Sequence, residues 1–401
     1  MTDMGLSAWR GYIDQLAPLA EKIAALSSRP HDEQWKADLY QFLYSQISVG
    51  YLFMISDPQY PEFIPYYNHI FGQGFPNPDD TLSQAVIEDR GIYQISGFRG
   101  SARIASLQLG GDVGSVARMI DDPKSLVGSS KGVFDLDSAI LAEDGSFEIL
   151  LSPERPRGYE GDWWKLEPEA TAVIVRQRHY DWTNEVDGRF AIQRLDVPAA
   201  KPRRSARDID KALGKISKYI EAYGEVSFDG PPTRHLRAAP PNSLTCKDYS
   251  NYGGLANQAF VEGMFELADD EALIIESDVP ERCAYWGFHL TDDFWQSIDW
   301  VNRHSSLNGH SARIDSDGKL RIVASAHDPG VPNWLDTVGR STGFVYGRWT
   351  DASDYPTPHV AKVKITDVSR QLPADTPVVT AEERDAAIRA RRRAVQLRRR
   401  W

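Results

Sequence analysis

The spacing of apolar residues changes once along this chain of 401 residues, and that change limits the folds available to it. Up to about residue 80, apolar positions recur every three or four residues, which is the period of a helix with one buried face. From Gly91 onward, short apolar runs follow the two-residue period of β-strands, and turn-forming residues separate them. Many short strands joined by turns predict antiparallel sandwiches rather than alternating β–α–β units.

The predicted fold is therefore mainly β with α. It has two antiparallel β-sandwich (jelly-roll-like) domains, a helical N-terminal region and a C-terminal helix. Helices are expected at about 7–26, 31–55, 63–71 and 206–223. The predicted divisions are a helical region over 1–80, a first β-sandwich over 81–200, a linker and helix over 201–242, a second sandwich over 243–370 and a basic helix over 371–401.

The formal net charge of −12 argues against a nucleic-acid-binding surface, because phosphate contacts depend on accumulated Lys and Arg. Residues 381–401 differ from the rest of the chain, with eight Arg and three acidic residues and hence a local charge of +5. The acidic residues come first and the arginines follow, an order that the helix dipole favours. This helix is expected to pack on the acidic body of the protein or on a neighbouring subunit, and a nucleic-acid-binding tail is the alternative.

The cysteine count and the hydropathy pattern favour the cytoplasm. Cys246 and Cys283 are the only cysteines, too few for a disulfide framework or a zinc ligand set. Residues 1–16 contain acidic side chains and no continuous apolar run, so no signal peptide is expected. No run of 18 apolar residues occurs, so no membrane-spanning helix is expected.

Sequence motifs for bound cofactors are absent. There is no phosphate-binding loop, no dinucleotide-binding fingerprint and no nucleophile elbow, so no cofactor is predicted. His304, His310 and His327 lie close in sequence, with Asp328 beside the last of them. These side chains could converge on a metal ion, but strand pairing decides which of them share a face, and no metal ligand is predicted.

General acid–base chemistry is the enzymatic function that the residues from 285 to 349 support best. The alternation in Tyr285–Leu290 places His289 on one face of a strand and the apolar side chains on the other. Imidazole is a common general base when a carboxylate orients it. The candidate catalytic residues are His289 or His304 as the base, Asp299 to orient it, and Arg303 or Arg348 to stabilise negative charge. The structural alternative is a half-buried strand histidine and a local Asp299–Arg303 salt bridge.

Aromatic and amide side chains in the same region are candidates for holding a ring-bearing ligand. The loop 328–337 is stiffened by two prolines and a glycine, although such a loop can also simply close the end of a sandwich. A second polar cluster at 176–185 could face the C-terminal domain, either as a ligand cleft or as an inter-domain salt-bridge patch. The candidate substrate-binding residues are Tyr252, Trp286, Trp295, Asn308, Asn333 and Trp334, with His179 and Tyr180 from the second cluster.

The C-terminal part of the chain resembles a mostly bacterial family known as domain of unknown function 1214. The resemblance runs from about Asn257 to Val368, and the region 91–196 looks like the β domain that commonly precedes it. It implies a jelly-roll-like sandwich and no particular activity. The resembling residues are Tyr285-Trp286, Ser297-Ile298-Asp299, Ser305-Ser306-Leu307-Asn308, Asp317-Gly318, the loop DPGVPNWLDT at 328–337, Gly343 and Arg348-Trp349.

The function expected from these features is that of a cofactor-independent enzyme. It would act by proton transfer, as a lyase or isomerase, on a bulky aromatic or polycyclic metabolite in a catabolic pathway. A hydrolase is less favoured, because no serine or cysteine nucleophile stands in a recognisable setting. The alternative is a non-catalytic small-molecule-binding or assembly protein, and in either case the chain is expected to form homo-oligomers.

Overall fold

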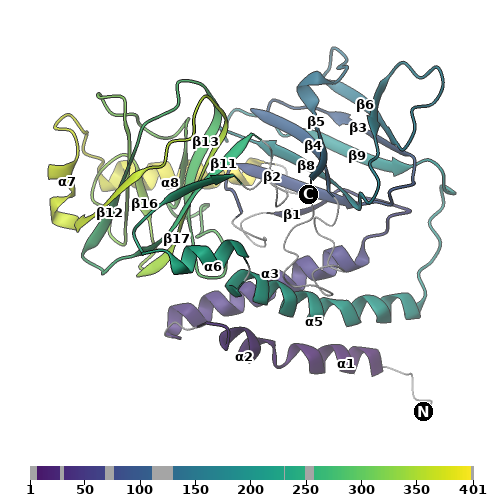
Figure 1. The fold of residues 1–401 in the computed structure, drawn as a ribbon, viewed down its shortest axis with the longest axis horizontal. Coiled ribbons are helices and arrows are strands. Elements are labelled where there is room, and N and C mark those ends of the chain that lie inside the picture. Colours follow the sequence, from purple (N-terminus) through teal and green to yellow (C-terminus); the bar gives the residue numbers. More distant parts are fainter. Residues whose placement is uncertain are drawn as a thin grey trace.

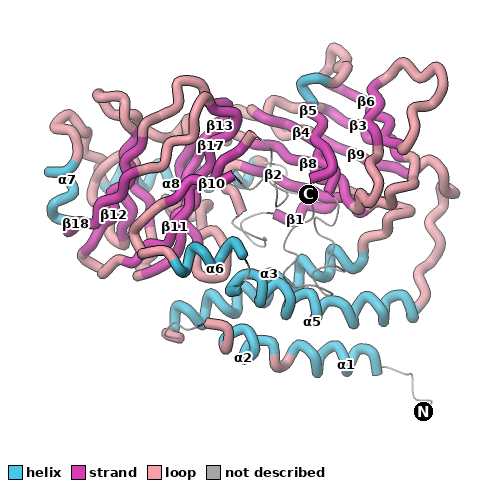
Figure 2. The backbone as a smooth tube through the Cα atoms, in the orientation of Figure 1, coloured by secondary structure: helices cyan, strands magenta, loops and turns pink. Residues whose placement is uncertain are grey.

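The computed structural model describes residues 7–27, 31–67, 76–110, 130–229, 231–248 and 257–398. Two β-domains stand side by side, and a layer of helices runs along one side of both (Figure 1). Strands dominate the two domains and helices the layer below them (Figure 2). The prediction of a mainly β protein with two β-domains, N-terminal helices and a C-terminal helix is confirmed.

The helical layer combines helices from two separate parts of the sequence. Pro18 lies at the break between the first two helices, where its missing N–H ends the hydrogen-bond ladder. The later helix α5 packs against all three N-terminal helices, and their shared core reaches Leu82 and Ile174 of the first β-domain. The helices are α1 (Ser7–Leu16), α2 (Leu19–Ala24), α3 (Glu33–Ile55), α5 (Ala206–Asp229) and α6 (Pro231–Ala238).

The first β-domain contains two sheets that pack face to face on an apolar core. One sheet has the strand order β1-β2-β8-β4-β5 and the other has the order β7-β6-β3-β9. The helix predicted over 63–71 is wrong where the structure describes it, because residues 64–67 pair with β2. The strands are β1 (Ile64–Tyr67), β2 (Asp80–Val86), β3 (Tyr93–Phe98), β4 (Ile104–Gly110), β5 (Ser130–Asp135), β6 (Ser146–Ser152), β7 (Asp162–Lys165), β8 (Ala172–Arg178) and β9 (Arg189–Arg194).

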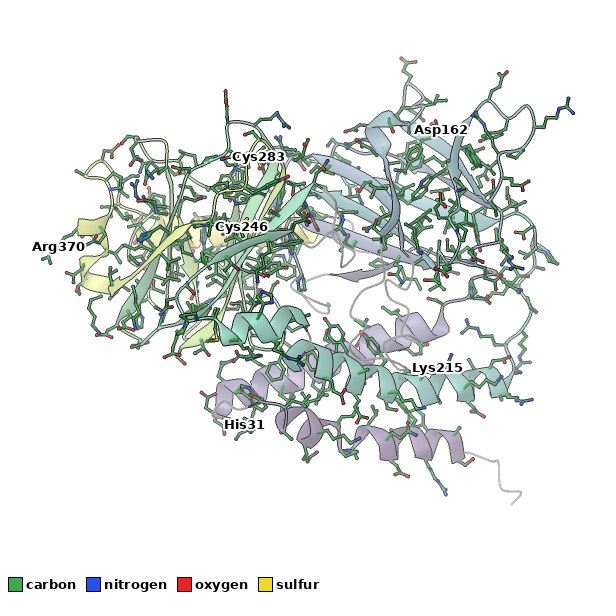
Figure 3. The ribbon with its side chains drawn as sticks, in the orientation of Figure 1. His31, Asp162, Lys215, Cys246, Cys283 and Arg370 are labelled. Atoms are coloured by element: carbon green, nitrogen blue, oxygen red, sulfur yellow. The ribbon has the colours of Figure 1, made fainter. Side chains whose placement is uncertain are left out.

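The C-terminal β-domain repeats this two-sheet plan. Its sheets have the orders β10-β11-β17-β13-β14 and β16-β15-β12-β18, and the first of these is called the central sheet below. Both cysteines, Cys246 and Cys283, are free and lie in this domain (Figure 3). The strands are β10 (Thr245–Asp248), β11 (Gln258–Glu266), β12 (Glu271–Ser277), β13 (Cys283–Thr291), β14 (Ser306–Asn308), β15 (Leu320–Ser325), β16 (Trp334–Asp336), β17 (Thr342–Ala352) and β18 (His359–Lys364).

The central sheet has two buried faces of different character. The alternation predicted for 285–290 is confirmed: Trp286, Phe288 and Leu290 belong to the apolar core between the sheets. The opposite face, called the outer face below, carries Tyr285 and His289, and both are buried. A sheet face buried on the side away from its own sandwich core must be covered by other parts of the protein, which makes it a place for polar groups with specific partners.

A buried ion pair in the first β-domain is also hydrogen-bonded to the C-terminal β-domain. The Arg178 guanidinium on β8 binds the Asp80 carboxylate on β2 through two contacts, Nε–Oδ1 at 2.6 Å and Nη2–Oδ2 at 2.9 Å. Its third nitrogen, Nη1, donates to Gln258 Oε1 at 2.7 Å and to Thr350 Oγ1 at 2.8 Å, both on the outer face. The same guanidinium lies 4.4 Å from the centre of the Tyr285 ring. One side chain therefore ties the first domain to three groups of the second.

The neighbouring carboxylate, Asp79, is a second connection. It accepts hydrogen bonds from Tyr285 Oη at 2.6 Å and Asn308 Nδ2 at 2.7 Å in the C-terminal domain, and from Trp182 Nε1 at 2.7 Å in the first domain. Burial raises the pKa of Asp79, and these hydrogen bonds oppose that rise. Asp79 and Asp80 are consecutive, so one short segment anchors both connections.

The C-terminal helix α8 (Ala381–Leu397) lies across the junction. Thr380 and Glu383 form a capping box at its start. Arg384 binds Asp328 at 2.8 Å, and Arg391 donates to the carbonyl of Ser306 while its guanidinium lies 4.5 Å from the Trp182 ring centre. The predicted helix packs on the body of its own chain. Within the described residues, no helix combines the length and apolarity needed to cross a bilayer.

We predict that Asp80→Asn destabilises the protein far more than Asp270→Asn. The side chains of Asp80 and Arg178 are each about 1% exposed, so removing the carboxylate charge leaves a buried guanidinium uncompensated. The expected cost is about 3–5 kcal/mol. Asp270 pairs with Lys364 at 2.8 Å on the surface, where water replaces the partner, so little change is expected there. Urea unfolding measures the stability of both variants. Equal unfolding midpoints for the two variants would contradict the central role of the buried pair.

Candidate functional site

The outer face of the central sheet carries a row of polar and aromatic side chains. Strand register places Glu262 on β11 opposite Tyr346 on β17, and Tyr346 opposite His289 on β13. The next row places Phe260 opposite Arg348. All five residues are buried, with Glu262 and His289 each only 1% exposed. An acid, a phenol, an imidazole and a guanidinium therefore share one covered sheet face.

Helix α6 brings a further imidazole to this face. Leu236 of α6 packs into a cluster with Phe260, Trp295 and Tyr346, and this contact seats the helix on the sheet. As a result His235 Nε2 lies 2.9 Å from Glu262 Oε1. A carboxylate that accepts the Nε2 proton leaves Nδ1 as the basic nitrogen of the ring. His235 and Glu262 thus form an imidazole–carboxylate pair of the kind that serves as a general base.

His289 is an imidazole of a different kind. Its ring meets the Tyr346 ring edge-on, with centroids 5.7 Å apart and planes at 70°. Its Nε2 atom is buried and has no hydrogen-bond partner among the residues that the structure describes. Burial lowers the pKa of His289 well below 6.5, and the nearby Arg348 guanidinium lowers it further. The ring is therefore neutral near pH 7, and it can donate or accept one hydrogen bond without carrying charge.

Arg348 connects this face to the domain junction. Its guanidinium lies 4.8 Å from the Tyr346 ring centre and 5.4 Å from the Phe260 ring centre. Its charge also acts on Asp80. Burial opposes ionisation of that carboxyl, but Arg178, Arg176 and Arg348 together hold the pKa of Asp80 well below its ordinary value. The face therefore combines a cation, aromatic walls and two imidazoles, which are the components of proton transfer on a ring-bearing molecule.

Three of the predicted site residues come together on this face. His289 and Arg348 are diagonal neighbours on β13 and β17, and Trp295 belongs to the aromatic cluster with Phe260 and Tyr346. Trp295 adopts a left-handed backbone conformation with φ +63°, which is uncommon for a bulky residue. The catalytic and binding roles assigned to these three residues remain predictions.

The other predicted catalytic residues lie elsewhere, near α8. His304 stacks on Trp334, and its Nδ1 lies 2.5 Å from the Trp334 carbonyl oxygen. Burial and the charges of Arg391 and Arg384 lower the pKa of His304 to about 3. Such a ring is a weak base near neutral pH, which disfavours His304 as the general base.

The expected pairing of Asp299 with an imidazole is wrong, and so is the alternative salt bridge with Arg303. Asp299 Oδ1 accepts hydrogen bonds from the backbone N–H groups of Val301 and Asn302, which makes it the cap of a local turn. Arg303 instead binds Asp336 at 2.6 Å. Asp299 is therefore held within its own turn, and Arg303 is held by a carboxylate of β16.

Apart from Trp295, the predicted substrate-binding residues that the structure describes fall into three groups. His179, Tyr180 and Asn308 meet at the domain junction, where Asn308 Nδ2 donates to the Tyr180 carbonyl oxygen. Trp286 packs in the core between the sheets, and Trp334 and Asn333 hold the 328–337 loop through hydrogen bonds to Ser325 and to the carbonyls of Arg313 and Arg321. Tyr252 lies outside the described residues.

At the junction, His179 is enclosed by two carboxylates. Its Nδ1 lies 3.0 Å from Glu185 and its Nε2 lies 3.0 Å from Asp187. The Tyr180 hydroxyl accepts a hydrogen bond from the backbone N–H of Trp286 at 2.8 Å. The cluster at 176–185 does face the C-terminal domain as the sequence indicated, and its contacts are those of an inter-domain joint.

His235 and Glu262 are the residues of this face that the sequence pattern did not indicate. The segment 230–242 looks like a Pro-rich loop, yet residues 231–238 form α6. Glu262 interrupts the apolar run Ala259–Phe265, and a carboxylate inside a strand of that composition is the signal that could have found it. Its pairing with a histidine 27 residues earlier depends on how α6 packs, which no local pattern shows.

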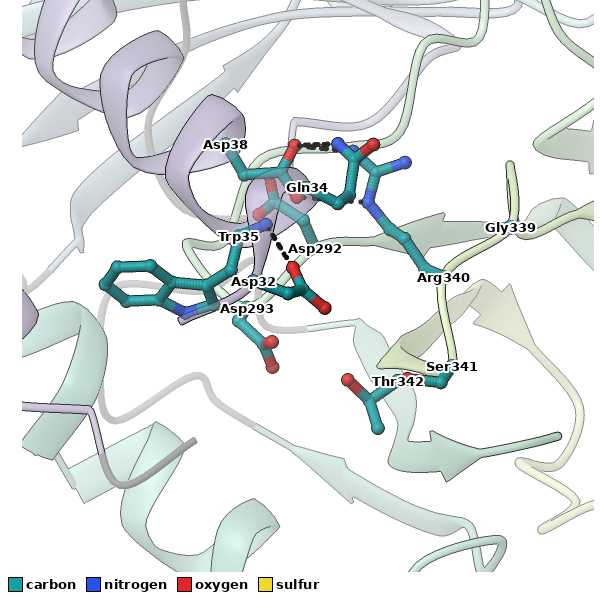
Figure 4. A pocket seen from close by; sticks show the side chains of 10 residues that line it. All are labelled: Asp32, Gln34, Trp35, Asp38, Asp292, Asp293, Gly339, Arg340, Ser341 and Thr342. Carbon is teal, nitrogen blue, oxygen red and sulfur yellow. Dashed lines mark hydrogen bonds and ion pairs between the residues drawn. The ribbon is translucent and has the colours of Figure 1, made fainter. Parts of the chain in front are cut away.

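A cavity of about 180 Å³ lies where α3 meets the C-terminal domain (Figure 4). Asp38 of α3 binds Arg340 there, with Oδ1 and Nη2 at 2.6 Å. Burial raises the pKa of the adjacent Asp292 well above its ordinary value, and the charge of Asp38 adds to this rise. The cavity is an acidic joint between the helical layer and the β-domain. In the described part of the chain, no three His, Cys, Asp or Glu side chains gather as a metal site.

The two buried neutral imidazoles make stability depend on pH. In the unfolded chain a histidine takes up a proton near pH 6.5, whereas folded His304 does so only near pH 3. The unfolded state therefore binds the extra proton below pH 6.5, and stability falls as the pH falls. We predict that His304→Gln removes about 1.4 kcal/mol of this loss per pH unit between pH 6 and pH 4. Urea unfolding between pH 6 and pH 4 measures the free energy of unfolding of both proteins. The same dependence of this free energy on pH in variant and wild type would contradict a buried neutral His304 ring.

Comparison with a solved structure supports the overall fold. A crystal structure of an uncharacterized protein from Burkholderia cenocepacia has a TM-score of 0.81 and 26% identity, and covers 91% of this chain and 99% of that chain. The VPA0106 protein from Vibrio parahaemolyticus has a TM-score of 0.47 and 11% identity, over 87% of this chain and 100% of that one. None of the curated proteins matches the chain. The resemblance predicted for the C-terminal domain is confirmed, because residues 266–353 match the family described as protein of unknown function (DUF1214).

Proposed function

We propose that the protein is a cofactor-independent enzyme that transfers a proton on a bulky aromatic molecule bound at the outer face of the central sheet. The observation that carries this proposal is the His235–Glu262 pair, with 2.9 Å between Nε2 and Oε1, on the same face as Arg348 and His289. A buried carboxylate fixes the imidazole tautomer and stabilises the imidazolium that forms when the ring accepts a proton. The lyase or isomerase class expected from the sequence fits this arrangement.

Each group has a role in such a reaction. The His235 nitrogen that does not contact Glu262 removes a proton from a carbon next to a carbonyl group or a ring. The electron pair of the broken C–H bond moves into that carbonyl or ring, and Arg348 stabilises the negative charge that develops there. Return of the proton to another carbon completes an isomerisation, and departure of a leaving group completes an elimination. His289 supplies a neutral hydrogen-bonding group beside the reacting molecule.

The burial of the outer face argues against an assembly surface there. His289 and Arg348 are 1% and 5% exposed, whereas a face that binds another subunit is open in the single chain. Cys246, which pairs with Val261 on the neighbouring strand, is a poor nucleophile. Burial, with the charge of Glu262, raises the pKa of Cys246 to about 11, so the thiol stays protonated. This favours proton transfer over a thiol-dependent hydrolase.

Metabolite profiling in D2O tests the proposal. The purified protein is incubated with a cell metabolite extract, and mass spectrometry follows both consumption and deuterium uptake. We expect at least one aromatic metabolite to be consumed, with deuterium on carbon in the product of an isomerisation or, through reversible proton removal, in the remaining substrate of an elimination. Glu262→Gln and His235→Asn should each slow that turnover by roughly 100-fold or more, because general-base catalysis contributes about 10²–10⁴.

Asp269→Asn is the matched control. Asp269 lies 2.9 Å from His327 in a similar imidazole–carboxylate pair, but both side chains are exposed, and they lie next to β12 and β15, which belong to the other sheet. Its turnover should equal that of the wild type. The proposal fails if wild-type protein changes no metabolite, or if Glu262→Gln turns over as fast as Asp269→Asn.

A further inference from the structure

His289 is an enclosed imidazole without a partner in the described part of the chain. The residue is 1% exposed, and its Nε2 atom is buried and makes no hydrogen bond there. Two other histidines are engaged: His179 lies 3.0 Å from each of two carboxylates, and His304 contacts a backbone carbonyl oxygen. A buried polar group without a partner costs free energy, and binding or catalysis is a reason to retain it.

Strand register fixes where His289 stands relative to the proposed base. His289 lies opposite Tyr346, and Tyr346 lies opposite Glu262, so the three residues occupy one row across neighbouring strands. Neighbouring strands are about 4.8 Å apart, which separates the positions of His289 and Glu262 by roughly 10 Å. His235 lies beside Glu262, with Nε2 2.9 Å from the carboxylate oxygen. Two imidazoles are therefore held at opposite ends of this row on the same covered face.

This separation suits a carbonyl group and the carbon atom next to it. A hydrogen bond from the His289 ring to a carbonyl oxygen spans about 2.9 Å. A carbon that loses its proton lies about 3–3.5 Å from the base. The carbonyl group and the adjacent carbon occupy the space that remains within the roughly 10 Å between the two positions. A substrate can thus contact both imidazoles with its reacting atoms between them.

The charge state of His289 favours a neutral acceptor. Burial, together with the charge of Arg348, holds the pKa of His289 well below 6.5, so the ring is uncharged near pH 7. An uncharged imidazole offers one N–H donor without a positive charge, which matches a ketone oxygen better than a carboxylate. Phe260, Tyr346 and Trp295 belong to one aromatic cluster on this face, which suits a ring attached to the ketone.

We infer that the site takes aromatic ketones, with His289 donating its N–H to the carbonyl oxygen next to the carbon that His235 deprotonates. This inference rests on the proposed function and names its substrate class. The electron pair of the broken C–H bond forms a C=C bond, and the π electrons of the carbonyl move onto its oxygen. The hydrogen bond from His289 stabilises the resulting enolate. His235 returns the proton to the same carbon or to a conjugated one, so nothing is oxidised or reduced.

Infrared spectroscopy of bound 2-acetylnaphthalene, isotopically labelled at the carbonyl carbon, tests the inference. This probe combines a ring, a ketone and C–H bonds next to the ketone. A hydrogen bond lowers the C=O stretching frequency, so we expect a lower frequency on the wild type than on His289→Phe, which keeps a flat ring without an N–H. Calorimetric titration should show about three- to tenfold weaker binding by His289→Phe, which is the contribution of one hydrogen bond.

Two further variants keep the result interpretable. His289→Gln retains an N–H donor and should retain the lowered frequency, which a merely structural role of the ring would not explain. His327→Phe removes an exposed imidazole next to β15 and should match the wild type in frequency and affinity. The inference is overturned if the wild type shows no saturable binding of the ketone, or if the wild type and His289→Phe give the same frequency.

Proton exchange in D2O separates this inference from the proposed function. NMR follows the acetyl protons of the same probe, which the wild type should exchange for deuterium and His289→Phe should exchange roughly 100-fold more slowly. Glu262→Gln should also slow the exchange but keep the lowered carbonyl frequency, because the donor is still present. A lowered frequency without exchange by the wild type supports ketone binding by His289 and contradicts proton transfer. Metabolite turnover without a lowered frequency supports proton transfer and contradicts the ketone class.

Discussion

The buried pairing of Arg178 with Asp80 is the interaction on which the rest of this structure depends. The guanidinium and the carboxylate lie 2.6 Å apart, and their side chains are about 1% exposed, so both groups lose their hydration. Only a full set of hydrogen-bonding and ionic partners compensates for that loss. Gln258 and Thr350 complete the partnering of Arg178, and both belong to the other β-domain. The two domains must therefore be docked for the ion pair to be satisfied. Asp79 and α8 reinforce the same junction from either side.

This docking creates the environment of the proposed site. The outer face of the central sheet would be open to water in an isolated domain, and the pKa of His289 would then lose the lowering that burial causes. Covered by α6 and by the junction, it holds His289 neutral and keeps Glu262 beside His235. Arg348 belongs to both regions, since its charge acts on Asp80 as well as on His289. Arg348 therefore takes part both in the domain junction and in the proposed reaction.

Much of the fold followed from local patterns, and the parts that did not were decided by long-range contacts. Alternation in 285–290 correctly separated the core side of β13 from its outer side, and the order of acids and arginines correctly predicted α8. The segment 64–67 was misassigned because its pairing with β2 overrides its local composition. Asp299 and His304 are near each other in sequence, but the Asp299 carboxylate accepts hydrogen bonds from the backbone of a local turn instead of orienting the imidazole. His235 and Glu262 meet only because α6 packs on the sheet.

Photolabelling with benzophenone, an uncharged aromatic ketone that attacks nearby C–H bonds on irradiation, is the most direct test of where a ring-bearing ligand binds. Peptide mapping by mass spectrometry locates the labelled residues. We predict labels within β11 and β17, the strands that carry Glu262, Tyr346 and Arg348, and their loss when 2-naphthol is present in excess. Labels confined to the helical layer or to the sheet that contains β12, and unaffected by 2-naphthol, would contradict this location.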